Sequence, residues 1–522
     1  MDARRTSPTE GDAREGATCT PESGSSPVSR RTFMNTALVG VANVTLGSVR
    51  LPSRQRVEAL TDIVSASATR LAAAIRRREV SCIEVVEACI QHIQRVNPHV
   101  NAVVQLTSDR ARAEAKARDR SLARREHVGP LHGVPITIKD SFDVAGVVST
   151  AGTTGRRAFV PASDAIAVAR MRAAGAILLG KTNCPELTLS YETDNLVYGR
   201  TSNPYDFART SGGSSGGAAA IIAAGGVSLD IGSDTGGSIR VPSHFCGIAG
   251  IKPTAGRVPR TGHIMPAEGV LQSLTQIGPM ARFVDDLILA LPIITGPDWR
   301  DASVVPLALR DPYAVSLRGL RVAAHADNGV YAVSEPCARA LDDAARVLAS
   351  AGCVIAHERP PDLARTYEAG NRLWRAAGSA TVRRLLAAAG TTDVSAPLRP
   401  WLDAPPHASA EDWTAIVEQL DDARGRMLSF LQRYDAILCP PCAFPAPEHG
   451  ATQREDLDAA FSYSEVYNYV GWPAVVVRVG MTQSRLPVGV QLVARPWRED
   501  VALALALRLE AELGGWKPSA LV

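Results

Sequence analysis

The chain contains little cysteine, nine residues among 522. A disulfide scaffold needs a dense and even set, so this sparse and odd number excludes one, and we expect most thiols to be buried and free. After residue 50 the sequence also lacks any run of 18 uninterrupted apolar residues. That absence excludes a membrane-spanning helix from this part of the chain.

There is also no excess of one charge sign. The 56 basic and 53 acidic residues are interspersed and give a net charge of +3, so no basic face stands out and no nucleic-acid partner is expected. We find no internal repeat, and no linker long enough to demand separate domains. The length and the 46% hydrophobic content are typical of a large globular enzyme.

The first 50 residues differ from the rest. Residues 1–28 are polar and rich in Ser, Thr, Gly and Pro, which predicts disorder. The letters SRRTFM at 29–34 then precede a short apolar stretch at 36–46, an order that resembles a twin-arginine export signal. We therefore expect export to the periplasm without stable membrane insertion. The alternative is a disordered tail with an accidental arginine pair on a cytoplasmic protein.

Residues 51–522 are expected to form a single domain of alternating helices and strands. Apolar side chains recur at three- and four-residue steps over residues 60–96, which predicts two helices, with Ser81 as N-cap of the second. Helices interleaved with short apolar strands favour an α/β sheet covered on both faces. The expected helices are residues 107–125, 165–174, 218–224 and 500–513, and the expected strands are 133–140, 176–179, 227–231, 436–438, 474–479 and 488–493.

Three glycine-containing motifs compete as the site of chemistry. The first is GAILLGKT at 175–182, which matches the pattern of a phosphate-binding loop. Such a loop must expose consecutive backbone N–H groups, yet its middle residues are apolar and favour a buried strand. Pro185 also follows too early for the helix that the motif requires, so we reject a nucleotide site.

The second motif is GGSSG at 212–216, which would make Ser214 the nucleophile of an α/β-hydrolase. That elbow needs an apolar strand directly before it, whereas residues 203–209 are expected to be a polar loop containing proline. A flexible linker also fits poorly, because an apolar helix starts directly after the motif.

The third motif is GSDTGGSIR at 232–240, which follows the strand at 227–231. Its glycines leave room for a substrate carbonyl, and the successive amides of Thr235, Gly236, Gly237 and Ser238 can converge on one anion. Taken alone, this segment fits an oxyanion hole and a structural turn equally well.

Resemblance to a known family decides between these interpretations. The letters GGSSGG at 212–217 and GSDTGGSIRVP at 232–242, with GVPITIKD at 133–140, resemble the motifs of the amidase signature family. Further similar elements are KTNCPE at 181–186, GIKPT at 250–254 and PVGVQL at 487–492, and the resemblance covers about residues 60–513. It implies a central mixed twisted β-sheet sandwiched between α-helices. It also implies that Lys181 belongs to the scaffold.

The resemblance assigns a Ser–Ser–Lys triad. Ser238 matches the nucleophile, Ser214 the bridging serine after a cis peptide bond, and Lys139 the base. This chemistry is coherent, because desolvation at the end of an apolar strand would lower the pKa of Lys139 and leave it neutral. Asp234 and Arg240 are expected to be a structural pair.

The resemblance implies an amidase that needs no cofactor or metal. It would cleave the C–N bond of a small-molecule carboxamide through an acyl-enzyme on Ser238, with Thr235, Gly236 and Gly237 in the oxyanion hole. Two alternatives remain, namely the A-type component of a glutamine-dependent, tRNA-linked amidotransferase and a serine esterase using Ser214.

The substrate stays undetermined. The pocket is expected in a variable region at about 298–470. Core packing explains its tryptophans as well as substrate binding does, and these are Trp299, Trp374, Trp401 and Trp413. The pair Cys439 and Cys442 has redox spacing, but a Pro-rich turn after a strand is favoured. A homodimer remains open.

Overall fold

The structure is a computed structural model that describes residues 63–266, 268–269, 274–403 and 408–521. The leader predicted at residues 1–50 lies outside the described residues, so export stays a prediction. Within the described ranges, no helix is both long and apolar enough to cross a bilayer. The eight cysteines in these ranges, which include Cys439 and Cys442, are all buried and free, as the sequence predicted.

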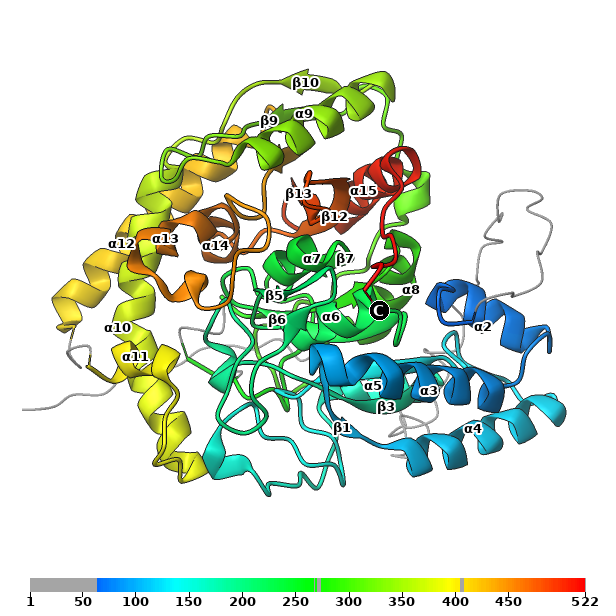
Figure 1. Ribbon diagram of the computed structural model, residues 1–522. Coiled ribbons are helices and arrows are strands. Elements are labelled where there is room, and N and C mark those ends of the chain that lie inside the picture. Colours follow the sequence, from blue (N-terminus) through cyan, green and yellow to red (C-terminus); the bar gives the residue numbers. More distant parts are fainter. Residues whose placement is uncertain (1–62, 267, 270–273, 404–407, 522) are drawn as a thin grey trace, which may run out of the picture. The chain divides into compact units, whose positions relative to one another are not determined.

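One mixed sheet of eleven strands organises the described chain (Figure 1). Its neighbours pair in both parallel and antiparallel directions, which confirms the predicted α/β class with a mixed sheet. In order across the sheet the strands are β1 (Val103–Leu106), β3 (Ile177–Thr182), β2 (Pro135–Lys139), β6 (Leu229–Asp234), β8 (Gln276–Ala281), β7 (Ala249–Lys252), β12 (Ala474–Met481), β13 (Pro487–Ala494), β11 (Ala436–Cys439), β9 (Arg321–Ala324) and β10 (Val354–Ala356).

Helices pack against both faces of this sheet. Side chains alternate between the faces of a strand, and in β13 Val490 and Leu492 join the main apolar core while Gln491 between them contacts the opposite side. The helices are α2 (Ala68–Arg76), α3 (Cys82–Val100), α4 (Ser108–Ala123), α5 (Ile166–Ala173), α6 (Gly216–Ala223), α7 (Arg240–Cys246), α8 (Val284–Ile294), α9 (Glu335–Ser350), α10 (Leu363–Ala389), α11 (Arg399–Asp403), α12 (Ala410–Phe430), α13 (Glu455–Asp458), α14 (Ser462–Tyr469) and α15 (Glu499–Leu513).

The second of the two predicted N-terminal helices, α3, begins where the sequence predicted. Ser81 caps α3 by accepting a hydrogen bond from the amide of Glu84, whose side chain in turn accepts one from the amide of Ser81. This reciprocal arrangement is a capping box, which satisfies two backbone donors that the helix itself leaves free.

The segment before the second motif differs from the prediction. Residues 203–209, expected to be a polar loop, lie mostly in a two-stranded sheet of β4 (Ser202–Asn203) and β5 (Asp206–Thr210). Their polar composition hid this hairpin, which pairs apart from the main sheet. The absence of a main-sheet strand directly before Ser214 nevertheless holds.

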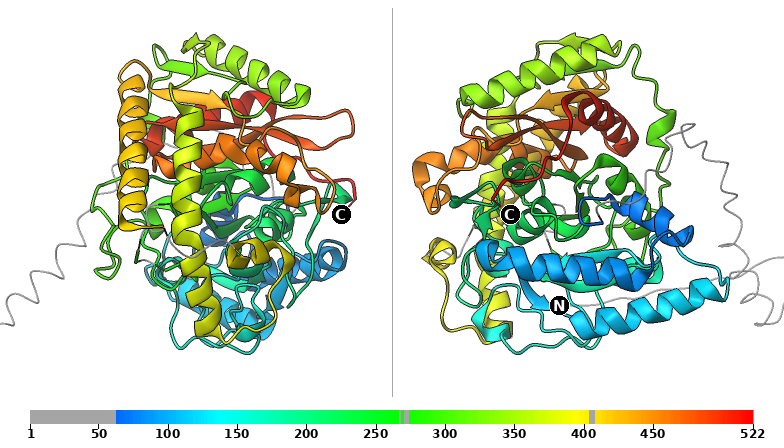
Figure 2. Two further views of the ribbon diagram at one scale, coloured as in Figure 1. Left: turned by 90° about the vertical axis from the view of Figure 1, so that its left-hand side faces the viewer. Right: turned by 45° about the vertical axis from the view of Figure 1, so that its right-hand side comes forward.

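The C-terminal half contains the long helices α10 and α12, which pack side by side (Figure 2). Trp374 and Trp401 meet edge to face with their ring centres 5.2 Å apart, in agreement with a packing role. Trp299 does not fit the core-packing interpretation, because 89% of its surface is exposed. Its flanking residues Asp298 and Arg300 lie in a polar turn that turns the indole outward.

The sheet order brings Lys139 and the third glycine motif to one edge. Strands β2 and β6 are adjacent and parallel, with Ile138 paired to Ile231. The carboxyl ends of parallel neighbours lie at the same edge of a sheet, so Lys139 at the end of β2 lies beside the loop that follows β6. The chain therefore converges on the predicted site from distant parts of the sequence.

Candidate active site

Lys139 is fully buried at the end of β2. Its Nζ lies 2.7 Å from Ser214 Oγ and 3.0 Å from Ser233 Oγ, both within hydrogen-bonding distance. Desolvation lowers the pKa of Lys139 to about 8, although the neighbouring Cys184, Asp234 and Asp230 oppose the shift. A substantial fraction of this lysine is therefore neutral near pH 8.

Ser214 follows a cis peptide bond with Gly213, as the resemblance implied, and directly precedes α6. The glycine at 213 is required by space, because a Cβ there would lie 2.4 Å from the carbonyl oxygen of Ser190. The next residue, Ser215, donates its amide to the carbonyl of Ser238 at 3.1 Å. This bond ties the Ser214 segment to the loop that carries Ser238.

Ser238 lies in the turn between β6 and α7 and is 6% exposed. The Asp234 carboxylate shapes this turn by accepting hydrogen bonds from the amides of Gly237 at 2.8 Å and Ile239 at 3.1 Å. Gly237 has a φ of +126°, a conformation that favours glycine. The segment DTGGS at 234–238 thus folds around the carboxylate of Asp234.

Among the predicted oxyanion donors, the amide of Gly237 is already engaged by Asp234. Within the described residues, the amides of Thr235, Gly236 and Ser238 donate no hydrogen bond. The Thr235 hydroxyl lies 3.1 Å from that of Thr275, which holds the threonine side chain. These three amides remain available for a ligand oxygen.

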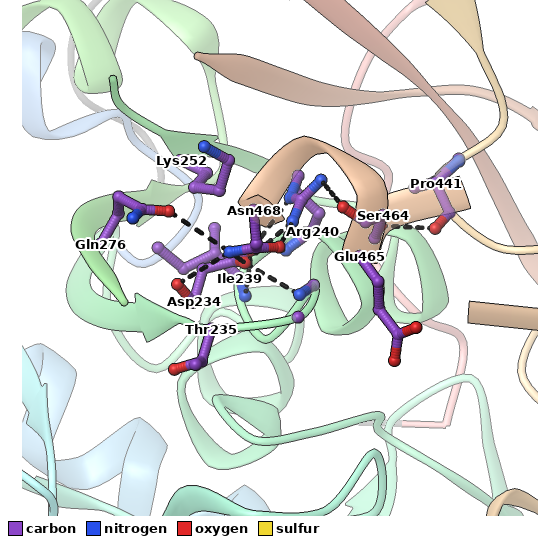
Figure 3. Close-up of polar contacts among 12 residues, drawn as sticks. Asp234, Thr235, Ile239, Arg240, Lys252, Gln276, Pro441, Ser464, Glu465 and Asn468 are labelled. Atoms are coloured by element: carbon purple, nitrogen blue, oxygen red, sulfur yellow. Dashed lines mark hydrogen bonds and ion pairs between the residues drawn. The ribbon is translucent and has the colours of Figure 1, made fainter. Parts of the chain in front are cut away.

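An ion pair between Asp234 and Arg240, drawn in Figure 3, supports the loop that carries Ser238. The guanidinium of Arg240 donates to Asp234 Oδ1 at 2.9 Å, and both side chains are fully buried. Burial alone would raise the pKa of Asp234, but Arg240 outweighs that effect and holds the pKa below its usual range. The predicted structural pair is therefore present.

Three further residues complete this network, and the sequence analysis assigned a role in the site to none of them. Arg240 also donates to the carbonyl of Ser464, to Gln491 Oε1 and to the side-chain oxygen of Asn468. The amide nitrogen of Asn468 donates back to Asp234 Oδ1 at 2.9 Å. For Gln491 the sequence offered one signal, namely a single side-chain amide in an otherwise apolar strand. Such a residue is expected to have a buried hydrogen-bond partner, because a buried polar group needs one.

This network yields a stability prediction. We expect Arg240→Met to lower the free energy of unfolding by about 3–5 kcal/mol, because it leaves the Asp234 carboxylate buried without its cation. Urea unfolding measures the change. The matched control is Arg339→Met, which breaks the exposed pair with Glu335 and should cost less than about 1 kcal/mol. Equal effects of the two variants would contradict the prediction.

Lys181 lies on β3, whose residues are all buried. Its Nζ pairs with Asp140 Oδ1 at 3.2 Å and donates to the carbonyl of Phe142 at 2.7 Å and to Ser149 Oγ at 2.8 Å. The segment that matches a phosphate-binding loop is thus mostly a buried strand, and its lysine holds neighbouring loops in place. This agrees with the scaffold role predicted for Lys181.

Arg478 lies on β12 near the end of the chain. It is 2% exposed and donates to the carbonyls of Gly515 and Gly480. Its side chain therefore anchors the C-terminal segment to β12.

The fold and the convergence of the segments that carry Lys139, Ser214 and Ser238 define an α/β enzyme of the amidase signature type. Residues 84–503 match the amidase family. The chain belongs to this family and is an amide-hydrolysing enzyme.

Similar proteins act on several kinds of amide. Fatty-acid amide hydrolase 2-A of Danio rerio is 34% identical over 482 residues, 86% of this chain and 89% of that protein. An acylamidase of Rhodococcus erythropolis is 35% identical over 85% of this chain and 95% of its own length. One component of the glutamyl-tRNA(Gln) amidotransferase of Carboxydothermus hydrogenoformans is 32% identical over 85% and 96%, respectively.

Solved structures of similar proteins agree with this family assignment. The structure of 6-aminohexanoate cyclic dimer hydrolase complexed with substrate superposes with a TM-score of 0.80 at 30% identity, covering 88% of this chain and 99% of that one. A fatty acid amide hydrolase structure superposes with a TM-score of 0.78 at 25% identity, covering 87% and 86%.

Proposed function

We propose that this amidase hydrolyses a small-molecule carboxamide with Ser238 as nucleophile, Ser214 as proton relay and Lys139 as base. The observation that carries the proposal is the 2.7 Å contact between the buried Lys139 Nζ and Ser214 Oγ. A water-exposed lysine would keep its proton near neutral pH, whereas desolvation lowers the pKa of Lys139 and lets it act as a base.

In the first half of the reaction, Ser238 Oγ forms a bond to the amide carbon while its proton passes to Ser214 Oγ. The proton of Ser214 passes at the same time to neutral Lys139. The negative charge that develops on the carbonyl oxygen is bound by the amides of Thr235, Gly236 and Ser238. The proton then returns through Ser214 to the leaving nitrogen, and the C–N bond breaks.

In the second half, water attacks the ester carbon of the acyl-enzyme and gives its proton to Ser214, which again passes one to Lys139. The Ser238–acyl bond breaks, and Ser238 regains a proton by the reverse route. The products are a carboxylic acid and ammonia or an amine. The chain's own residues supply every proton transfer in this scheme.

The test is a panel of aryl and aliphatic amides incubated with purified protein, with released amine or ammonia as the readout. We expect turnover of at least one simple amide by the protein alone. The amidotransferase alternative predicts instead that ammonia is released from glutamine only when partner proteins are added. Light scattering on the same sample would test the homodimer.

A further inference from the structure

The hydroxyl of Tyr191 connects a carboxyl group to the loop that carries Ser238. It lies 2.8 Å from the carbonyl oxygen of Gly236 and 2.5 Å from Oε1 of Glu465 on α14. A phenol has one proton, and the Gly236 carbonyl can only accept. If Glu465 were ionised, two acceptors would compete for that proton. If Glu465 is a neutral acid, it donates to Tyr191, which donates to Gly236.

The surroundings of Glu465 favour the neutral acid. Burial is the main cause that raises the pKa of its carboxyl to about 8, and the charge of Asp458 adds to the shift. The hydrogen bond from Tyr191 and the charge of Arg240 oppose the shift. Its Oε2 atom is buried and has no hydrogen-bond partner within the described residues. An unpartnered oxygen costs far less on a neutral acid than on a carboxylate.

The ionisable groups around Glu465 leave this assignment unchanged. The side chain extends from α14 away from the Arg240 guanidinium, which Asp234 and Asn468 already engage (Figure 3). Burial raises the pKa of Tyr191 well above its usual value, so the phenol keeps its proton. The other titratable groups that interact with Glu465 are Asp458, Tyr367, Tyr469 and Cys442.

The position of the Gly236 carbonyl makes this chain of hydrogen bonds relevant to catalysis. The carbonyl of Gly236 and the amide of Gly237 belong to one peptide plane. Tyr191 holds its oxygen, and Asp234 holds its N–H at 2.8 Å. The amides of Gly236 and Ser238 lie on either side of this plane, so fixing the plane fixes their direction.

We propose that neutral Glu465 and Tyr191 form a positioning pair that holds the Gly236–Gly237 peptide, and that ionisation of Glu465 releases it. This inference rests on the proposed function, because it concerns the oxyanion donors of that site. Ionised Glu465 would accept the one hydrogen bond that the Tyr191 hydroxyl can donate, and the Gly236 carbonyl would lose its donor. Preorganised donors contribute most when they need not reorient during the reaction, so release of the peptide lowers kcat.

Three variants test the pair through the dependence of kcat on pH. Glu465→Gln presents an N–H to Tyr191 at every pH, so it should keep kcat within about threefold at pH 7 and abolish the fall in kcat above pH 8. Tyr191→Phe keeps the ring stacked on Phe461, whose centre is 3.8 Å away, and removes only the hydroxyl. We expect it to lower kcat about tenfold with little change in KM. Glu465→Ala should lower kcat similarly.

Two results would overturn the positioning pair. One is a Glu465→Gln variant as impaired as Glu465→Ala, and the other is an alkaline fall that persists unchanged in Glu465→Gln. Thermal unfolding midpoints identify any variant that merely fails to fold. Labelling of Ser238 by a fluorophosphonate separates this inference from the proposed function. If the proposed function fails, Ser238 is unlabelled in the unmodified protein. If only the pair fails, Ser238 is labelled throughout.

Discussion

Replacing Ser238 by alanine is expected to lower kcat about 100,000-fold, because no other group would form the acyl-enzyme. Amine release from the best amide of the panel measures the loss. Ser211→Ala is the matched control, since Ser211 is a buried serine of the neighbouring segment whose hydroxyl, among the described residues, makes only a 3.5 Å contact with the carbonyl of Thr201. It should retain most of the activity.

Covalent labelling identifies the nucleophile independently of turnover. A fluorophosphonate should modify the peptide that contains Ser238 and leave Ser214 unmodified. Modification of Ser214 would support the esterase alternative and refute the assignment of Ser238. Retained amidase activity in Ser238→Ala would refute it as well, whatever the labelling result.

Replacing Lys139 by alanine is expected to lower kcat about 1,000- to 10,000-fold, at the upper end of what a general base contributes. The base must be neutral, and the pKa of Lys139 is lowered to about 8. Activity of the unmodified protein should therefore rise as the pH increases toward 8, and fall about tenfold for each unit below it. Lys139→Ala should lose this rise together with the activity.

The variant Lys139→Arg tests whether residue 139 acts as a base or only as a positive charge. Arginine keeps the positive charge and the hydrogen-bond donors, but it does not lose its proton in this pH range. We expect Lys139→Arg to be as inactive as Lys139→Ala. Recovery of activity in the arginine variant would show that residue 139 acts by holding Ser214 in place, and the base would then have to be sought elsewhere.

Most of the scaffold around the site could be predicted from local sequence. The strand that ends at Lys139 is a run of β-branched residues, and the helix after Ser214 is a run of Ala and Ile, so short-range pattern sufficed for both. The hairpin of β4 and β5 could not be predicted, because its polar strands carry no apolar alternation. The outward position of Trp299 follows from a turn that hydropathy does not reveal.

Part of the site depended on partners far away in the sequence. The letters DTGGS predict a tight turn, but only the folded chain commits the amide of Gly237 to Asp234. Tyr191 and Glu465 are 274 residues apart and match no motif, so nothing local linked them to Gly236. Gln491 lies in the PVGVQL element, but only the folded chain brings it to Arg240, which is 251 residues away in the sequence.

The sequence by itself determined the class of fold and the amidase family, and it predicted Lys139, Ser214 and Ser238 as the triad, because short motifs and local periodicity carry that information. The tertiary structure decided the lowered pKa of Lys139 and which backbone amides remain available. Both depend on burial and on hydrogen-bond partners, which arise only when β2, β6 and α14 pack together and exclude water from the groups between them.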